Sequence, residues 1–221
     1  MSKQSKEFIK RKKQSDWHWD YWDDRQDNHM FKFVGNIKGK WPKIPKRNES
    51  NKMESTNPSV IAQQGHYGIT TKQIFSAMWL RDKDMKKYER FITPLGLENP
   101  VAYIHTQNPG QMTVIHMDTA RANNIHLDKN GKPLTEKQRR QRIARLFIML
   151  DDWKPGQIML MGSRHCVRWK KGDIIYFSWQ HLPHGTANFG HDPRPMLFIQ
   201  GEVTEKFKKI LNNKKKITIK A

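Results

Sequence analysis

The chain has 221 residues, 36% of them hydrophobic, and its 41 Lys and Arg outnumber 21 Asp and Glu to give a formal net charge of +20. This length favours one domain with extensions. The charge favours an anionic partner, nucleic acid or acidic protein, bound through the basic ends, with solvated and weakly anion-binding tails as the alternative. Cys166 is the only cysteine, which excludes an intramolecular disulfide and a Cys-based zinc site. No apolar run approaches the ~20 residues that cross a bilayer, and the charged start lacks the apolar stretch of a secretory signal. We therefore expect no membrane insertion and a cytoplasmic location.

Residues 1–57 are interpreted as a basic and aromatic N-terminal extension. Residues 10–13 are all basic, and Trp17, Trp19 and Tyr21 occupy every second position of the segment that follows. Such alternation is typical of a strand that covers a core. Stacking on nucleic-acid bases is the alternative, but the neighbouring aspartates would repel phosphates.

A helix is predicted over residues 71–92, because apolar residues recur there at spacings of three, four or seven and form one stripe. Thr70 or Thr71 can cap its start, and Pro94 and Gly96 end it. The members of the stripe are Ile74, Met78, Met85, Tyr88 and Ile92.

From Val101 onward, short apolar runs alternate with turns, a pattern typical of a β sandwich or barrel. The expected strands are 101–106, 112–118, 143–150, 157–161, 173–179 and 195–203. Thr135 and Gln138 have the spacing of a capping box, which predicts a short helix. The organisation is thus a domain over 58–204 with a β core at about 101–203, then a basic tail over 205–221 that forms a helix or is frayed.

One pair of side chains on the second expected strand points to chemistry. His116 and Asp118 are separated by one residue, and residues i and i+2 of a strand project from the same face. A second imidazole, from His184, would complete a set of two histidines and one carboxylate, which suits non-haem Fe(II) and leaves positions open for substrate and dioxygen. The alternative is a hydrogen-bonded His–Asp pair in a cupin-like sandwich without iron. His181 and His191 compete locally with His184, after which residues 185–188 could carry the chain into a hairpin.

The motif His116-x-Asp118, then His184, then Arg194 ten residues later, with Lys171-Gly172-Asp173 before the second histidine, resembles the 2-oxoglutarate and Fe(II)-dependent dioxygenases. The resemblance covers residues 101–203, roughly half the chain. It implies a double-stranded β-helix (a jelly-roll or cupin-like core), mainly β with flanking helices. It also implies that His116, Asp118 and His184 bind Fe(II), and that Arg194 binds the distal carboxylate of 2-oxoglutarate. The family's reaction consumes 2-oxoglutarate and O₂ and usually hydroxylates a primary substrate.

Several further residues are candidates for contacts with 2-oxoglutarate. Tyr103, Gln111 and Thr113 could hydrogen-bond it from the early strands, with ordinary sheet packing as the alternative. The family often places Ser or Thr two residues past the arginine, but Met196 stands there, so the second carboxylate contact must come from elsewhere. His105 could point inward from the preceding strand, or could be an ordinary core histidine.

The primary substrate is predicted to be a protein side chain or an amino-acid-like molecule. Arg145 is interpreted as a residue of the site or of a surface ion pair, and Arg121, Asn123 and Asn124 as a substrate loop or a solvated one. An oxygenase acting on nucleic acid is an alternative, although Gln200 stands where such enzymes usually carry a second arginine. A non-enzymatic basic binding protein with a cupin-like sandwich is another.

Overall fold

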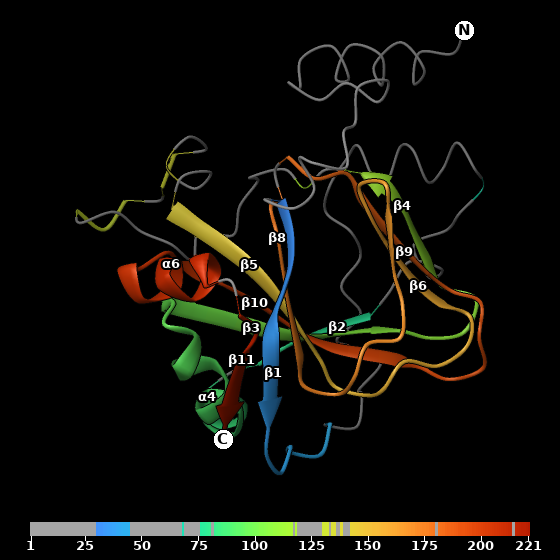
Figure 1. The fold of residues 1–221 in the computed structure, drawn as a ribbon, viewed down its shortest axis with the longest axis horizontal. Helices are drawn as coiled ribbons and strands as arrows, with labels where there is room; N and C mark the ends of the chain where they lie inside the picture. The colour runs from blue at the N-terminus through green and yellow to red at the C-terminus, as the bar shows by residue number, and fades with distance from the viewer. Residues whose placement is uncertain are drawn as a thin grey trace, which may run out of the picture.

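The computed structural model describes residues 30–44, 68, 76–80, 82–116, 118, 130–132, 134–135, 138, 142–179, 181–213 and 215–221. These residues form two β-sheets packed against each other, with helices beside the larger sheet (Figure 1). The mainly β fold with flanking helices is therefore confirmed.

The larger sheet has seven strands in the order β11-β1-β8-β5-β10-β3-β2, and the smaller has four in the order β4-β9-β6-β7. The larger sheet contains β1 (Phe31–Lys38), β2 (Ser76–Trp79), β3 (Glu98–Gln107), β5 (Ile143–Met149), β8 (Asp173–Phe177), β10 (Arg194–Glu202) and β11 (Ile217–Lys220). The smaller sheet contains β4 (Met112–His116), β6 (Gln157–Met161), β7 (Arg164–Cys166) and β9 (His184–Asn188). The helices are α4 (Asp82–Ile92), the 3₁₀ turn η4 (Thr93–Leu95) and α6 (Glu205–Asn212).

The eight strands from β3 to β10 have the topology of a jelly roll. In the larger sheet, β8, β5, β10 and β3 lie side by side in that order. In the smaller sheet, the order is β4, β9, β6 and β7. The pairings among these eight strands are antiparallel. This is the double-stranded β-helix arrangement of two interleaved Greek keys.

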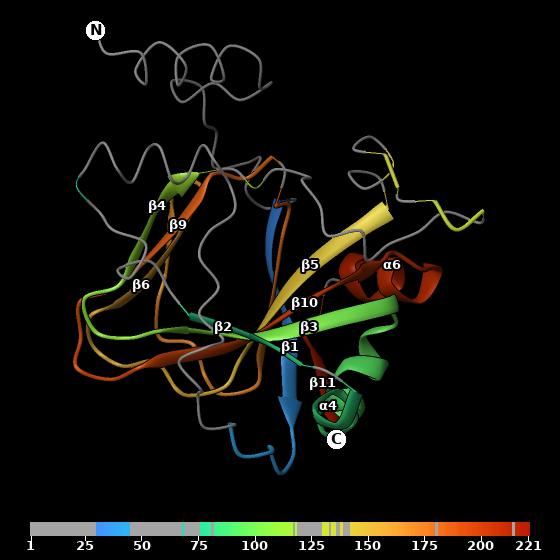
Figure 2. The ribbon, with the colours of Figure 1, turned by 180° about the vertical axis from the view of Figure 1, so that it is seen from behind.

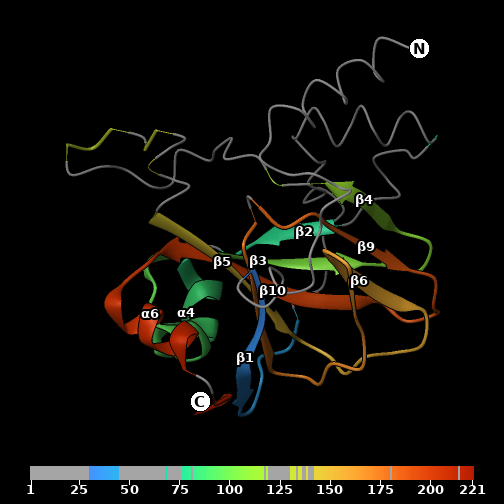
Figure 3. The ribbon, with the colours of Figure 1, turned by 45° about the horizontal axis from the view of Figure 1, so that its top comes forward.

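The apolar side chains form two separate clusters, one on each face of the larger sheet. Leu197 and Ile199 of β10 belong to the cluster beneath the helices, whereas Met196 and Phe198 belong to the cluster between the two sheets. Strand β10 is buried along its whole length because it is covered on both faces. Figures 2 and 3 show α4 and α6 together on one side of the larger sheet, away from β4, β9 and β6.

The predicted helix over 71–92 is wrong over residues 76–80, and residues 71–75 lie outside the described residues. The helix α4 begins at Asp82, and Ser76–Trp79 instead form strand β2, whose backbone pairs with β3 at the edge of the larger sheet. An apolar stripe cannot by itself distinguish a helix from an edge strand that pairs with a distant segment. The predicted end is confirmed, since η4 follows and Gly96 closes it with a φ of +72°.

The strand predictions are largely confirmed, with differences at their ends. Strand β4 ends at His116 rather than at residue 118, and residues 184–188 form strand β9 instead of a hairpin turn. The short strand β7 was not predicted. Thr135 and Gln138 make the reciprocal hydrogen bonds of the expected capping box, from each backbone N–H to the other side chain.

The two ends of the chain also contribute to the larger sheet. Strand β1 lies between β8 and β11, and β11 pairs parallel to β1. Both lie in segments that the sequence assigned to the extension and the tail. The boundaries at residues 57 and 204 stay predictions, and the Trp-rich segment at 17–22 lies outside the described residues.

Neither described helix is long and apolar enough to span a bilayer.

Helix α6 is short, and Thr204 caps it by accepting a hydrogen bond from the Phe207 N–H at 3.2 Å.

Because Phe207 is fully buried against the larger sheet, Phe207→Ala should lower the free energy of unfolding by about 3–5 kcal/mol. Urea denaturation followed by circular dichroism measures this change. Lys209→Ala, on the exposed face of the same helix, is the matched control and should cost less than about 1 kcal/mol. Equal effects of the two substitutions would mean that α6 is not part of the core.

Candidate metal centre

The backbone pairing of β4 with β9 places the two predicted histidines opposite each other. His116 pairs with His184, and Thr113 pairs with Thr186, so three steps along β4 match two steps along β9. The extra residue is a β-bulge. Because paired residues share a face of the sheet, the bulge puts both Thr113 and His116 on the face that His184 and Thr186 occupy.

Asp118 completes the cluster from just beyond the end of β4. Its Oδ1 lies 3.5 Å from His116 Nε2, and its Oδ2 lies 3.6 Å from His184 Nε2. The three residues form the one group among the described residues whose His, Cys, Asp or Glu ligand atoms converge, with all separations within 4.8 Å. The Asp118 N–H donates to the Trp179 carbonyl at 3.1 Å, which fixes the backbone there without a strand.

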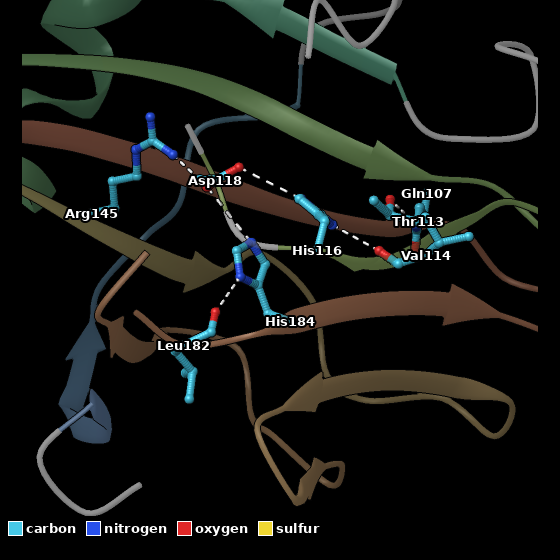
Figure 4. Close-up of polar contacts among 8 residues, drawn as sticks. All are labelled: Gln107, Thr113, Val114, His116, Asp118, Arg145, Leu182 and His184. Atoms are coloured by element: carbon cyan, nitrogen blue, oxygen red, sulfur yellow. Dashed lines mark hydrogen bonds and ion pairs between the residues drawn. The ribbon is translucent and has the colours of Figure 1, made fainter. Parts of the chain in front are cut away.

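Hydrogen bonds to the backbone orient both imidazoles (Figure 4). His116 Nδ1 lies 2.7 Å from the Val114 carbonyl oxygen, and His184 Nδ1 lies 2.9 Å from that of Leu182. A carbonyl only accepts, so each Nδ1 carries the hydrogen and each Nε2 of a neutral ring offers a lone pair. Both lone pairs face Asp118, and such fixed tautomers are characteristic of metal-ligating histidines. The residues present therefore fit a divalent metal ion.

Arg145 of β5 forms an ion pair with Asp118, with its Nη1 donating to Oδ2 (Figure 4). Of the two interpretations of Arg145, the structure thus places it in the site. Burial acts to raise the pKa of the Asp118 carboxyl, but the charge of Arg145 and the polar contacts with the two histidines outweigh it and hold that pKa well below its ordinary value. Asp118 is therefore a carboxylate ready to bind a cation.

Arg194, the first residue of β10, is buried between the sheets with 1% of its surface exposed. Its Nη2 donates to Gln107 Oε1 at 2.7 Å, and its guanidinium carbon lies 6.0 Å from the Trp169 ring. The buried Nε has no hydrogen-bond partner in the described structure. Burial lowers the pKa of Arg194 to about 10, so the side chain is charged at neutral pH and can accept an anion.

Gln107 of β3 connects Arg194 to the strands that carry the histidines. Its Nε2 donates to Thr186 Oγ1 at 2.7 Å and to Thr113 Oγ1 at 3.3 Å. Because its Oε1 accepts from Arg194, the amide cannot be turned over without losing these bonds. The sequence did not single out Gln107. Its position two residues after His105 on an inward-facing strand was the available signal.

The other predicted contacts with 2-oxoglutarate divide into two groups. Tyr103 and His105 lie on the same face of β3 as Gln107, and the Tyr103 hydroxyl is electrostatically coupled to Arg145 and Asp118. Burial and then the charge of Arg194 lower the pKa of His105 well below its ordinary value, so the ring is neutral. Gln111 instead closes the β3–β4 turn, because its Oε1 accepts from the Asn108 N–H at 2.7 Å.

The competing histidines do not join the centre. His181 and His191 are exposed and lie outside the converging group. The loop candidates Arg121, Asn123 and Asn124 lie outside the described residues.

Trp179 was also missed by the sequence, although its indole organises one side of the site. Its ring lies 4.2 Å from the Arg145 guanidinium carbon, and its Nε1 donates to the Ile143 carbonyl at 3.0 Å. Trp179 lies two residues beyond the end of β8. Its contacts with Arg145 and Ile143 join segments far apart in the chain, so no local sequence signal reveals them.

No protein-family model matches the chain, and no curated protein matches it. Solved structures do. A prolyl-4-hydroxylase from Pseudomonas putida is 17% identical with a TM-score of 0.44, the match covering 64% of this chain and 81% of that one. A viral collagen prolyl hydroxylase from Paramecium bursaria Chlorella virus-1 is 15% identical with a TM-score of 0.37, covering 58% and 80%. A cupin 2 conserved barrel domain protein from Salinispora arenicola is 9% identical with a TM-score of 0.37, covering 77% and 97%. At these scores the matches place no function on this chain.

Because His105 is buried in its neutral form, the free energy of unfolding of the metal-free protein should depend on pH. The unfolded chain takes up a proton near the ordinary pKa of 6.5 while the folded protein does not, so the unfolded state gains stability as pH falls below that value. The free energy of unfolding should therefore decrease below pH 6.5, by at most about 1.4 kcal/mol per pH unit from this one group.

Urea denaturation between pH 5 and 8 tests this expectation, and His105→Gln should flatten the slope below pH 6.5. His165→Gln, at an exposed position, is the matched control and should keep the wild-type slope. An unchanged slope in His105→Gln would show that His105 is protonated in the folded protein.

Proposed function

We propose that this protein is an Fe(II)- and 2-oxoglutarate-dependent oxygenase, and that it hydroxylates a protein side chain or an amino-acid-like molecule. The observation that carries the proposal is the convergence of three ligand groups: His116 Nε2 from β4, His184 Nε2 from β9, and the carboxylate of Asp118, two residues beyond the end of β4. Two neutral imidazoles and one carboxylate suit Fe(II) and leave coordination positions open.

The three ligands would hold the metal with little rearrangement of their own. Both histidine rings already have their Nδ1 atoms engaged by backbone carbonyls. One Asp118 oxygen can bind the ion while Oδ2 remains bonded to Arg145. With metal and co-substrate bound, the centre would supply decarboxylation of 2-oxoglutarate by O₂ to succinate and CO₂, with the second oxygen atom inserted into a substrate C–H bond.

Arg194 would bind the distal carboxylate of 2-oxoglutarate, as its burial, its charge and its unpartnered Nε favour. The position two residues later is Met196, which cannot donate a hydrogen bond. His105 pairs in register with Met196 on the neighbouring strand and lies near the charge of Arg194. We therefore assign His105 as a second contact for that carboxylate. Thr113 would act indirectly, by holding Gln107 and through it Arg194.

The first test is an anaerobic titration of metal-stripped protein with Fe(II) and then 2-oxoglutarate, followed by visible absorption. A charge-transfer band that requires both additions is expected for the wild type and should be absent in Asp118→Ala, because the only carboxylate of the metal set is lost. Asp84→Ala, on the outer surface of α4, should keep the band. Folded wild-type protein with no band would favour a metal-free binding protein instead.

Arg194→Met should weaken 2-oxoglutarate by about 100-fold, since charge-assisted hydrogen bonds contribute about 1.5–3 kcal/mol each, while leaving Fe(II) affinity within a few fold. Calorimetric titration of both ligands separates the two effects. Arg90→Met, at an exposed position on α4, controls for loss of a cation. Unchanged 2-oxoglutarate affinity in Arg194→Met would remove Arg194 from this role.

A further inference from the structure

A second arginine, Arg145, is held firmly beside the metal set. Its side chain is 15% exposed, its Nη1 donates to Asp118 Oδ2, and its guanidinium lies over the rings of Trp179 at 4.2 Å and Phe198 at 5.6 Å. Two aromatic faces and one carboxylate restrict the guanidinium plane, because cations are attracted to ring faces. The side chain is therefore placed before any ligand arrives.

The bonding capacity of Arg145 is only partly used. A guanidinium carries five N–H donors in a flat fork, and its Nε is buried without a hydrogen-bond partner in the described structure. An unpaired buried donor is unfavourable and is normally explained by a missing ligand or water. Nε and a neighbouring Nη form the edge that binds a carboxylate through two parallel bonds.

The net charge on the interior face of the described sheets favours the binding of more than one anion. Arg145 and Arg194 are both cationic, and Asp118 is the carboxylate paired with Arg145. Glu202, on the same face of β10, is already paired with Arg142. A divalent ion would add two positive charges, and a dicarboxylate would remove two. One positive charge then remains, and an uncompensated charge in a poorly solvated interior is costly.

We propose that Arg145 binds a ligand carboxylate at the metal end of the site, separate from the anion site at Arg194. The inference rests on the proposed function. Arg145 pairs in register with Gln200, six residues beyond Arg194 on β10, so the two arginine Cα atoms are separated by about 20 Å along the sheet at 3.3 Å per residue. The remaining positive charge favours a carboxylate of the primary substrate, and the keto-acid end of 2-oxoglutarate is the other source that the unpartnered Nε would accept.

The presence of Gln200 at the position of a second arginine therefore does not exclude a second arginine from the site. The sequence position six residues after Arg194 lacks a guanidinium, but the neighbouring strand supplies one directly opposite. Register, which the sequence does not display, brings Arg145 to that place.

The experiment measures ligand binding to the Fe(II)-loaded protein without O₂, by calorimetry, with 2-oxoglutarate and with pyruvate, a keto acid that has no distal carboxylate. The variants are Arg145→Gln and Arg145→Lys. Arg142→Gln, which also removes an arginine–carboxylate pair, is the matched control. Circular dichroism and Fe(II) affinity establish that each variant is folded and loaded.

If the carboxylate belongs to the keto acid, Arg145→Gln weakens both 2-oxoglutarate and pyruvate by about 10- to 100-fold, and Arg145→Lys recovers part of the loss. Arg194→Met, by contrast, weakens only 2-oxoglutarate. If the carboxylate belongs to the primary substrate, both keto acids bind Arg145→Gln normally. Acetate then binds the wild type loaded with Fe(II) and 2-oxoglutarate, and loses that binding in Arg145→Gln but not in Arg142→Gln.

Wild-type affinities for all three probes in Arg145→Gln would overturn this inference and leave Arg145 as a partner of Asp118 alone. Failure of the proposed function has a different signature, since the wild type itself would then bind neither Fe(II) nor 2-oxoglutarate.

Discussion

The pairing of β4 with β9 determines what the interior of this protein can do. These two strands come from distant parts of the chain, and their antiparallel register sets His116 opposite His184. The single-residue bulge between Thr113 and His116 then places the side chains of these two residues on the same face of the sheet. A shift of one residue without the bulge would send one of the histidines to the other side of the sheet. The metal set, the threonine contacts and the approach of Asp118 all depend on this register.

A polar network crosses the interior and couples the two sheets. Gln107 on the larger sheet donates to Thr186 on the smaller sheet and accepts from Arg194. Around it lie Met149, Met159 and other members of the cluster between the sheets. Such a network is expensive to bury unless its members are satisfied. One donor of this network, Arg194 Nε, has no hydrogen-bond partner among the described residues.

The electrostatics of the site follow from two arginines that face the same interior from different strands. Arg145 neutralises Asp118 and keeps its carboxyl ionised, although burial alone would favour the protonated form. Arg194 is farther along the sheet, where it lowers the proton affinity of His105. Both of these arginines are enclosed by the fold, with 1% of Arg194 and 15% of the Arg145 side chain exposed.

The sequence by itself determined the β-rich centre of the fold and singled out His116, Asp118 and His184, whose ligand atoms the fold brings together. Short apolar runs divided by Pro-Gly turns are local signals of strands, and His116-x-Asp118 with His184 and Arg194 is a local motif. Local signals could not place β2 and β9, because a strand there exists only through pairing with a distant segment. They also did not identify Gln107 or Trp179 as members of the site, and they left Arg145 open between the site and a surface ion pair. Their roles come from register and from contacts across the two sheets, and these arise only when the tertiary structure brings residues far apart in the chain within a few ångströms.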